Sequence, residues 1–182
     1  LVPTPEWKKQ IKNESWYIGD TYHLSIGQGD ISVTPLQIAR MTAYFASDGK
    51  WIRPQLVLDK SLALSDATKL SFDSGEPDIN SPHIETVRQG LRQAALSGSA
   101  RALAGLPGGV AGKTGTAQWS TLKSPHAWFT GWAPYENPDL VITVLVEEGG
   151  EGSAVAVPIA KEILMWWFSN AHLSTLTKNT AN

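Results

Sequence analysis

Residues 110–148 read VAGKTGTAQWSTLKSPHAWFTGWAPYENPDLVITVLVEE and contain the clearest strand pattern in the chain. Their apolar and β-branched runs predict three strands, at 110–118, 127–133 and 141–148. The link between the last two is polar and carries two prolines, so we expect a hairpin loop at 134–139. The third strand is apolar on both faces, which is typical of a strand covered by helices on each side.

The hairpin fixes the expected order of this sheet. The strand at 110–118 should pair with the far side of 127–133, which gives an antiparallel sheet with 127–133 in the middle. The rest of the chain offers no strong strand candidate for the other edge of 141–148. Because an exposed β-branched edge is an aggregation hazard, we expect 141–148 to pair with another polypeptide. That polypeptide is either a separate N-terminal fragment or a second copy of this chain.

A strong helix signal lies ahead of the sheet. Thr34 has the character of an N-cap, Pro35 suits the first helical position, and Gln37 completes a capping box. The helix is expected to end near Gly49 and to bury one stripe of side chains, formed by Ile38, Met41 and Phe45. Before it, the sequence predicts surface structure over residues 1–20, a short strand over Thr21 to Ile26, and a turn at 27–30.

Two more helices are expected, one before the three strands in the sequence and one after them. The first opens at Ser81-Pro82, and its core stripe consists of Ile84, Val87, Leu91 and Ala94 or Ala95. The other is capped by Ser153, runs to about Phe168, and should be kinked by Pro158.

The remaining segments carry weaker signals. Residues 51–58 are predicted to be extended, and 97–109 to be a connection with one helical turn. The Asp-, Ser-, Gly- and Pro-rich stretch 59–80 predicts a surface excursion, and 170–182 a frayed tail.

Composition narrows the classes of function. The chain has 182 residues, a formal net charge of −2, a pI of about 6.1 and no cysteine. These values favour one domain and exclude disulfides, thiolate metal sites and the basic patch of a nucleic-acid-binding protein. The longest apolar runs, 140–146 and 163–168, are far shorter than the roughly 20 residues of a membrane span. We therefore expect no membrane contact from this chain, and a membrane anchor in a segment outside it.

The chemistry is concentrated in Lys113-Thr114-Gly115-Thr116. On a strand, Lys113 and Gly115 share one face while Thr114 and Thr116 share the other. Glycine on the face of the lysine leaves space for a reacting centre. Two hydroxyls beside a fixed positive charge can bind a carboxylate. At a sheet edge, the free backbone groups can also pair with an extended peptide and stabilise an oxyanion.

Other segments accompany this tetrapeptide in a fixed order. Trp7, Lys8 and Trp16 precede Gly19-Asp20-Thr21, and then follow the stretches IGQG at 26–29, TPLQIA at 34–39, KTGTAQ at 113–118 and AWFTGWAP at 127–134. This series resembles class B penicillin-binding proteins, most closely the penicillin-binding protein 2 group. The resemblance covers most of residues 1–168. It implies an α+β fold of the β-lactamase/transpeptidase type, an antiparallel sheet flanked by helices on both faces, of which residues 1–182 are the C-terminal part.

The resemblance also implies a role for each residue of the tetrapeptide and its surroundings. Lys113 would hydrogen-bond the serine of a Ser-x-Asn motif and help to position its proton. The Thr114 and Thr116 hydroxyls, beside Gly115, would bind the terminal carboxylate of the substrate or of a β-lactam. The backbone N–H of Thr116 would form half of the oxyanion hole. Gln118 would be a weaker substrate contact.

The other two motifs of the family are not present in a usable form. No Ser-x-Asn occurs, and the two Ser-x-x-Lys matches lie in unsuitable places. Ser47-Asp48-Gly49-Lys50 falls where a helix ends, and Ser120-Thr121-Leu122-Lys123 falls in a turn between strands. We therefore expect the serine nucleophile to lie outside this chain, in the missing N-terminal half of the domain.

Several simpler interpretations compete with these assignments. Gly112-Lys113-Thr114 mimics a phosphate-binding loop, but Pro107 stands where that loop needs a glycine. Gly27-Gln28-Gly29 and Gly149-Gly150-Glu151-Gly152 are each interpreted as structural turns. Trp128, Phe129 and Trp132 suit core packing, whereas Trp119 could line a substrate groove. The four histidines show no ligand spacing, so neither a metal nor a cofactor is expected.

The resemblance implies a parent enzyme that cross-links peptidoglycan at the extracytoplasmic, periplasmic face of the cytoplasmic membrane. Its serine would attack the penultimate D-Ala carbonyl of a stem peptide ending in D-Ala-D-Ala, and would also react with β-lactams. Two alternatives stay open: a D-Ala-D-Ala carboxypeptidase of the same fold, and a non-catalytic binding fragment. A P-loop NTPase is a remote third.

Overall fold

The computed structural model describes residues 1–54 and 83–179, with side chains up to residue 170. The predictions for 55–58, for 59–80 and for the opening of a helix at Ser81-Pro82 therefore lie outside the described residues. The elements in chain order are α1 (Pro5–Lys12), α2 (Ile18–Ser25), α3 (Pro35–Ala46), α4 (Ile84–Leu96), the short 3₁₀ helix η1 (Arg101–Leu103), β1 (Ala111–Ala117), β2 (His126–Ala133), β3 (Leu140–Val146) and α5 (Ala156–Asn179).

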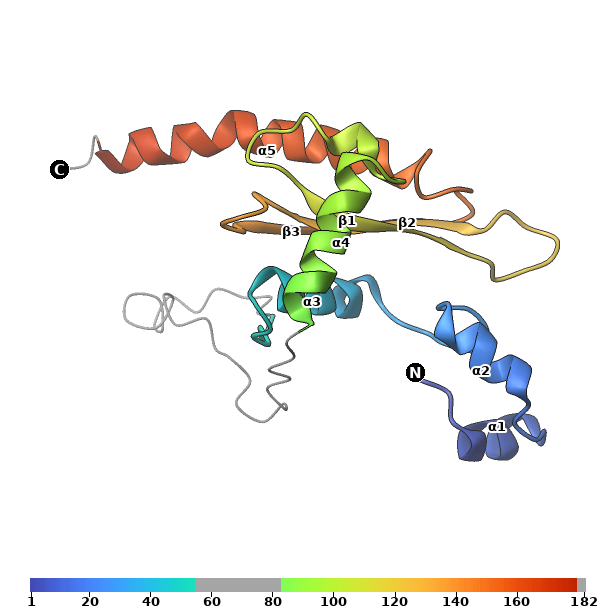
Figure 1. Cartoon of the computed structure of the whole chain (residues 1–182). Helices are drawn as coiled ribbons and strands as arrows, with labels where there is room; N and C mark the ends of the chain where they lie inside the picture. The colour runs from blue at the N-terminus through green and yellow to red at the C-terminus, as the bar shows by residue number, and fades with distance from the viewer. Residues whose placement is uncertain (55–82, 180–182) are drawn as a thin grey trace.

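The strands form one antiparallel sheet in the order β1-β2-β3, as predicted (Figure 1). Thr114 lies opposite Phe129 in the first pair, and Phe129 lies opposite Val144 in the second. Within the described residues, β1 and β3 are thus the two edges of this sheet. No strand from the described part of residues 1–54 covers β3, so its pairing with another polypeptide stays a prediction.

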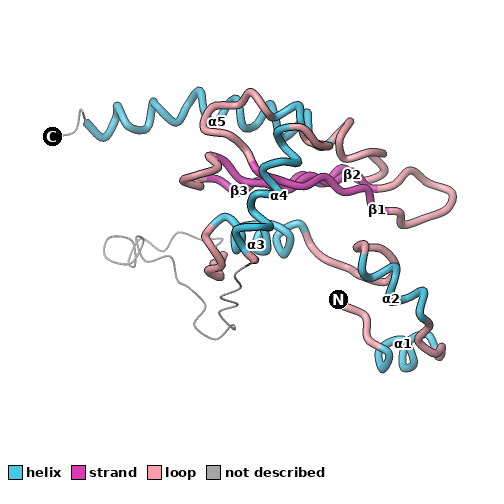
Figure 2. The backbone as a smooth tube through the Cα atoms, viewed as in Figure 1, coloured by secondary structure: helices cyan, strands magenta, loops and turns pink. Residues whose placement is uncertain are grey.

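Helices cover both faces of the sheet, which confirms the predicted architecture (Figures 1 and 2). On one face, α5 and η1 enclose the larger core, in which Phe129, Leu103, Val157 and Leu164 are fully buried. On the other face, α3 contacts β2 and β3. The helix α4 contacts β1 and contributes to both cores, since Ala95 belongs to the α5 side and Leu91 packs on the α3 side.

The start of α3 matches its prediction, and its buried stripe is confirmed in part, since Phe45 packs on the α3-side core. The Thr34 hydroxyl accepts from the N–H of Gln37 at 3.2 Å, and the Thr34 N–H donates to the Gln37 side chain at 2.8 Å. The buried residues are Thr42, Tyr44 and Ala46, whereas Met41 is 44% exposed. Thr42 lies on the same face as Ile38 and Phe45, where its hydroxyl bonds Thr130 of β2 at 2.7 Å, a contact that hydrophobic periodicity cannot reveal.

The predicted stripe of α4 is also wrong in part. Val87 is 40% exposed, whereas Arg88 is only 5% exposed. The Arg88 guanidinium donates to the carbonyls of Phe45 and Ala46 at 2.6 and 2.8 Å, where α3 ends. It also lies over the ring of Trp132, 5.5 Å from the centroid. Burial of this cation is tolerated because its guanidinium pairs with the carboxylates of Asp48 at 3.1 Å and Glu85 at 3.5 Å, and because it satisfies carbonyls that the end of α3 leaves without helical partners.

The short strand predicted over Thr21 to Ile26 is wrong, because these residues belong to α2 and its C-terminal cap. The Asp20 carboxylate accepts from the N–H of Tyr17 at 2.7 Å and begins the helix there. None of the residues of α2 is buried, so the weak alternation in this segment does not place apolar side chains against a core. The capping hydrogen bond at Tyr17 therefore decides the local structure, and a helix forms. The turn that follows is as predicted, with left-handed backbone at Gly27 (φ 73°) and Gly29 (φ 79°).

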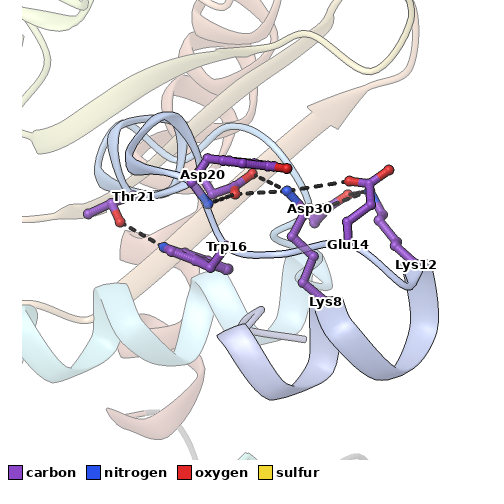
Figure 3. A network of polar contacts seen from close by, with 8 residues as sticks. Lys8, Lys12, Glu14, Trp16, Asp20, Thr21 and Asp30 are labelled. Carbon is purple, nitrogen blue, oxygen red and sulfur yellow. Dashed lines mark hydrogen bonds and ion pairs between the residues drawn. The ribbon is translucent and has the colours of Figure 1, made fainter.

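Ion pairs connect α1, α2 and the following turn (Figure 3). The Lys8 ammonium is 2.9 and 2.8 Å from the two carboxylate oxygens of Asp20, and Lys12 contacts Asp30 at 2.6 and 2.8 Å. The N-terminal residues are therefore an ordered pair of helices, more structured than the surface segment expected from their sequence.

The C-terminal helix differs from its prediction at both ends. It begins at Ala156, so Pro158 lies in its first turn, where the missing N–H has no helical acceptor and no kink is required. Ser153 therefore lies before the helix rather than at its cap. The backbone is helical to Asn179, although a tail was expected from residue 170. Residues 169–179 contain neither glycine nor proline, so nothing in their composition interrupts the helix. Within the described ranges, no helix is long and apolar enough to cross a membrane.

Candidate active site

The tetrapeptide Lys113-Thr114-Gly115-Thr116 lies on β1, at an edge of the sheet. Cross-strand register assigns its faces. Thr114 stands opposite Phe129 of the α5-side core, and Lys113 stands opposite Thr130, which bonds α3. The two threonines therefore face the α5 side and Lys113 and Gly115 face the α3 side, which agrees with the predicted alternation.

Lys113 is exposed and bends toward the free edge of β1. Its ammonium donates to the carbonyl oxygen of Thr114 at 2.8 Å. Backbone groups of alternate residues in an antiparallel edge strand point away from the sheet. The Thr114 carbonyl belongs to that outward set, so the positive charge of Lys113 lies beside the edge on which an extended peptide could pair.

Each threonine hydroxyl has one hydrogen-bond partner among the described residues. The Thr114 hydroxyl is 2.7 Å from the hydroxyl of Ser99, in the connection after α4. The Thr116 hydroxyl accepts from the backbone N–H of Gly152 at 3.4 Å. A hydroxyl can both donate and accept, so each of these threonines retains capacity for a further hydrogen bond. Ser99 was not recognised from the sequence, since a single serine in a small-residue segment carries no pattern.

Two glycines permit close backbone packing around the tetrapeptide. A side chain on Gly152 would collide with the backbone oxygens of Gly115 and Trp128, so glycine is required where the link from β3 to α5 crosses β1 and β2. A Cβ on Gly115 would lie 3.2 Å from the Cβ of Trp128. The space expected beside Gly115 is therefore partly occupied by Trp128. The turn at 149–152 is structural, as interpreted from its sequence.

The side chain of Gln28 forms an unexpected contact with the free edge of β1. Its amide nitrogen donates to the carbonyl of Thr116 at 2.9 Å, and its amide oxygen accepts from the N–H of Gln118 at 3.2 Å. The sequence of Gly27-Gln28-Gly29 predicts only a turn. A polar residue between two glycines was the available signal, but it does not indicate which partner it contacts.

Gln118 and Trp119 are held by the loop between β1 and β2. The Gln118 side chain donates to the carbonyls of Ser120 and Lys123. The Trp119 ring stacks on His126 with centroids 5.2 Å apart and is 49% exposed. The structure therefore places the Gln118 amide on the protein's own loop, and its role as a substrate contact remains a prediction.

Neither Ser-x-x-Lys match has the geometry of a nucleophile paired with its lysine. The Ser47 hydroxyl donates to the carbonyls of Ala43 and Lys50 at 2.8 and 2.7 Å, where left-handed backbone at Asp48 ends the helix. The Ser120 hydroxyl accepts from the N–H of Leu122 at 3.1 Å. Its candidate lysine, Lys123, pairs instead with Glu148 at 2.6 Å.

These features agree with a comparison of the sequence with protein families. The model described as "Penicillin binding protein transpeptidase domain" matches residues 3–165. The chain belongs to this family. The match confirms the resemblance inferred from the motifs, and the transpeptidase fold inferred with it.

Curated relatives of this transpeptidase-family chain cover nearly all of it. Peptidoglycan D,D-transpeptidase MrdA of Haemophilus influenzae is 36% identical over an alignment 190 residues long, which covers 92% of this chain and 29% of that protein. Peptidoglycan D,D-transpeptidase PbpA of Mycolicibacterium smegmatis is 38% identical over 75% of this chain and 30% of its own length. The chain thus spans less than a third of each of these relatives.

Solved structures of family members are also similar to this chain. Pseudomonas aeruginosa PBP2 in complex with WCK 5153 has a TM-score of 0.74 and 36% identity, covering 91% of this chain and 36% of that one. Helicobacter pylori PBP2, solved in complex with MreC, has a TM-score of 0.76 and 30% identity, with coverage of 94% and 31%. Penicillin-binding protein A of Mycobacterium tuberculosis, solved as a penicillin G acyl-enzyme, has a TM-score of 0.57 and 28% identity over 79% of this chain and 34% of that one.

Proposed function

We propose that this chain is the C-terminal part of a peptidoglycan D,D-transpeptidase domain and supplies the strand with the Lys-Thr-Gly motif, which forms one side of the active site. The observation that carries the proposal is the location of Lys113-Thr114-Gly115-Thr116 on the edge strand β1, with the lysine ammonium beside the free edge. The membership of the chain in the transpeptidase family supports the same assignment. The serine nucleophile and the Ser-x-Asn motif would come from the N-terminal half of the domain.

The chemistry requires both halves together. The serine attacks the penultimate D-Ala carbonyl of a stem peptide, and the negative charge that develops on the carbonyl oxygen is stabilised by the N–H of Thr116 and the N–H of the nucleophile. Collapse of this intermediate breaks the peptide bond and releases the terminal D-Ala, which takes a proton as it leaves. The amine of a neighbouring stem peptide then attacks the ester, forms the cross-link and restores the serine hydroxyl.

The residues of β1 have distinct roles in this scheme. Thr114 and Thr116, with Gly115 between them, bind the terminal carboxylate through their hydroxyls, and Lys113 positions the proton of the Ser-x-Asn serine. Gln118 is a weaker substrate contact. A β-lactam is bound by the same groups, because it also has a carboxylate next to a reactive carbonyl. The reaction uses no cofactor and takes place on the extracytoplasmic side of the membrane, where the substrate lies.

Intact mass spectrometry after incubation with penicillin tests the proposal. Full-length protein should gain the mass of one penicillin, on a serine outside these 182 residues, whereas the chain alone should gain none. A stable adduct mapped to Ser47 or Ser120 in the chain alone, or no adduct on the full-length protein, would overturn the assignment.

Product analysis with a pentapeptide substrate separates transpeptidase from carboxypeptidase activity. A transpeptidase forms a cross-linked dimer when an acceptor amine is supplied. A carboxypeptidase releases D-Ala to water and yields only the shortened peptide, and that result would contradict the transpeptidase assignment.

A further inference from the structure

The Gln28 side chain pairs with the edge of β1 in the way that a neighbouring strand would. One amide group both donates to the Thr116 carbonyl, at 2.9 Å, and accepts from the Gln118 N–H, at 3.2 Å. These are the donor and acceptor that two residues of an edge strand present to an incoming strand. The contact joins residues 88 and 90 positions apart in the sequence, so it connects the α2 turn with the proposed catalytic strand.

The backbone around Gln28 holds its side chain in place. Gly27 and Gly29 both have positive φ values, 73° and 79°, which residues with a side chain rarely adopt. The N–H of Gln28 donates to the carbonyl of His23 at 2.9 Å, which ties the turn to the end of α2. Because the turn is fixed, Gln28 is pre-organised for its contact with β1, and the entropic cost of ordering the side chain is reduced.

The pairing has a direct consequence for Thr116. The N–H and C=O of one residue in an antiparallel strand point to the same edge, and the Thr116 carbonyl points to Gln28. The Thr116 N–H therefore also points away from β2, at the free edge. Gln28 restrains the Thr116 carbonyl and the Gln118 N–H with two hydrogen bonds. These bonds fix the orientation of the Thr116 backbone and therefore the direction of its N–H, which is the proposed oxyanion donor.

We propose that Gln28 is a positioning residue for acyl transfer, which orients the backbone of Thr116. The inference rests on the proposed function, because Thr116 needs accurate orientation only if its N–H stabilises an oxyanion. Gln28 acts through the backbone of β1, because its amide bonds the Thr116 carbonyl and the Gln118 N–H. The Thr116 carbonyl retains a second lone pair, so it can still accept a hydrogen bond from an extended substrate.

Two substitutions in the full-length protein test this role. Gln28→Ala removes both hydrogen bonds, and Gln28→Glu keeps the shape but places a carboxylate against the Thr116 carbonyl. Gln89→Ala is the matched control, since within the described ranges the Gln89 side chain bonds Glu85 on the exposed face of α4. Stopped-flow acylation by a fluorescent penicillin separates the dissociation constant of the first complex from the rate constant of acylation.

We expect Gln28→Ala to lower the acylation rate constant about tenfold, and Gln28→Glu to lower it further, with the dissociation constant changed by less than about twofold. A misdirected oxyanion donor affects the transition state more than the first complex. The infrared carbonyl band of the acyl-enzyme should also move to higher frequency, because a weaker hydrogen bond leaves more double-bond character. Gln89→Ala should match the wild type in both measurements.

The proposal is wrong if both Gln28 variants acylate at the wild-type rate, or if a lower rate comes with an unshifted carbonyl band. Equal losses in binding, rate and melting temperature would also overturn it, because they would indicate only a loosened fold. Failure of the wild-type protein to form any penicillin ester would contradict the proposed function instead, so the two failures are distinguishable.

Discussion

Lys113 and Thr116 occupy opposite faces of the same strand, and the roles proposed for them separate ligand binding from reaction. A threonine hydroxyl can hold the carboxylate of the ligand before any bond changes. A lysine that positions a proton is needed when the serine attacks. The distinction is testable because substitution at each position should change a different kinetic constant.

In full-length protein, Thr116→Val should weaken the initial binding of penicillin by roughly 10- to 150-fold, since a hydrogen bond to a charged group contributes about 1.5–3 kcal/mol. Lys113→Ala should instead slow acylation by about 10²–10⁴, the range of general acid–base effects. Acylation kinetics report both constants. Thr86→Val, on the exposed surface of α4, is the control. Unchanged kinetics in both variants would refute the assigned roles.

Arg88 is the buried charge that the sequence did not identify as structural. Its guanidinium donates to the carbonyls of Phe45 and Ala46 and lies over Trp132. Arg88→Ala should lower the free energy of unfolding by about 2–4 kcal/mol, because two buried carbonyls lose their donor and the packing on Trp132 is lost. Arg88→Lys should recover part of the loss, since an ammonium cannot reproduce the planar fork.

Urea denaturation measures these differences in the free energy of unfolding. Arg101→Ala, at an exposed position in η1, should remain within about 0.5 kcal/mol of the wild type. If Arg88→Ala were no more destabilising than Arg101→Ala, the capping role of Arg88 would be wrong.

At the scale of elements, the pairing of α1 with α2 depends on charge. The Lys8 ammonium and the N–H of Tyr17 both donate to Asp20 and hold the pKa of its carboxyl below the ordinary 3.8. A carboxyl whose pKa is lower in the folded state stabilises that state above its unfolded pKa, and the contribution disappears as pH falls through the folded pKa. The α1–α2 pair should therefore loosen in acid, below about pH 3.8.

Hydrogen exchange of the α2 amides, followed from pH 6 down to about pH 2.5 and corrected for intrinsic rates, measures this loosening. Asp20→Asn cannot ionise, so its α2 protection should be lower than that of the wild type near neutral pH and should change little on acidification. Loss of protection in Asp20→Asn over the same pH range as in the wild type would assign the acid sensitivity to another group.

The helix α3 shows why an apolar stripe can mislead. Its sequence offers Ile38, Met41 and Phe45 as one face, yet Thr42 is buried and Met41 is exposed. The Thr42 hydroxyl bonds Thr130, and Thr130 bonds Thr143 of β3 at 2.8 Å. A satisfied chain of hydroxyls removes the cost of burying threonine, so Thr42 can lie between Ile38 and Phe45 on the face that meets the sheet.

At the scale of the whole molecule, strand β3 has a pairing partner on only one of its two edges among the described residues. Ile142 and Val144 are buried by helices, but only β2 pairs with the strand within the described ranges. We predict that β3 pairs with a strand of the proposed N-terminal half. Its outward amides should then be protected from hydrogen exchange in full-length protein, because they would donate to the added strand.

The comparison is with this 182-residue chain produced alone, in which those amides should exchange faster or become protected only as the protein self-associates. Size-exclusion chromatography at several concentrations distinguishes these two cases. Equally fast exchange of the outward β3 amides in full-length protein would show that β3 is a true edge, and the proposed division of the domain would be wrong.

Most of the framework follows from local sequence. The strands at 110–148, their order, the cap at Thr34 and the turn at 27–30 each depend on residues close together in the chain, so periodicity and capping chemistry suffice to predict them. The faces on which the side chains of residues 113–116 lie could also be predicted from the sequence, because side chains alternate between the two faces of any strand.

Only the tertiary structure showed that Gln28 bonds the edge of β1, that Arg88 is buried at the end of α3, and that Thr42 turns toward the sheet. These contacts join residues 88, 43 and 88 positions apart. A polar side chain in a turn or on a helix has the same local pattern whether it meets solvent or a distant carbonyl. Its partner is chosen when the elements pack, since a buried polar group must then find a hydrogen bond.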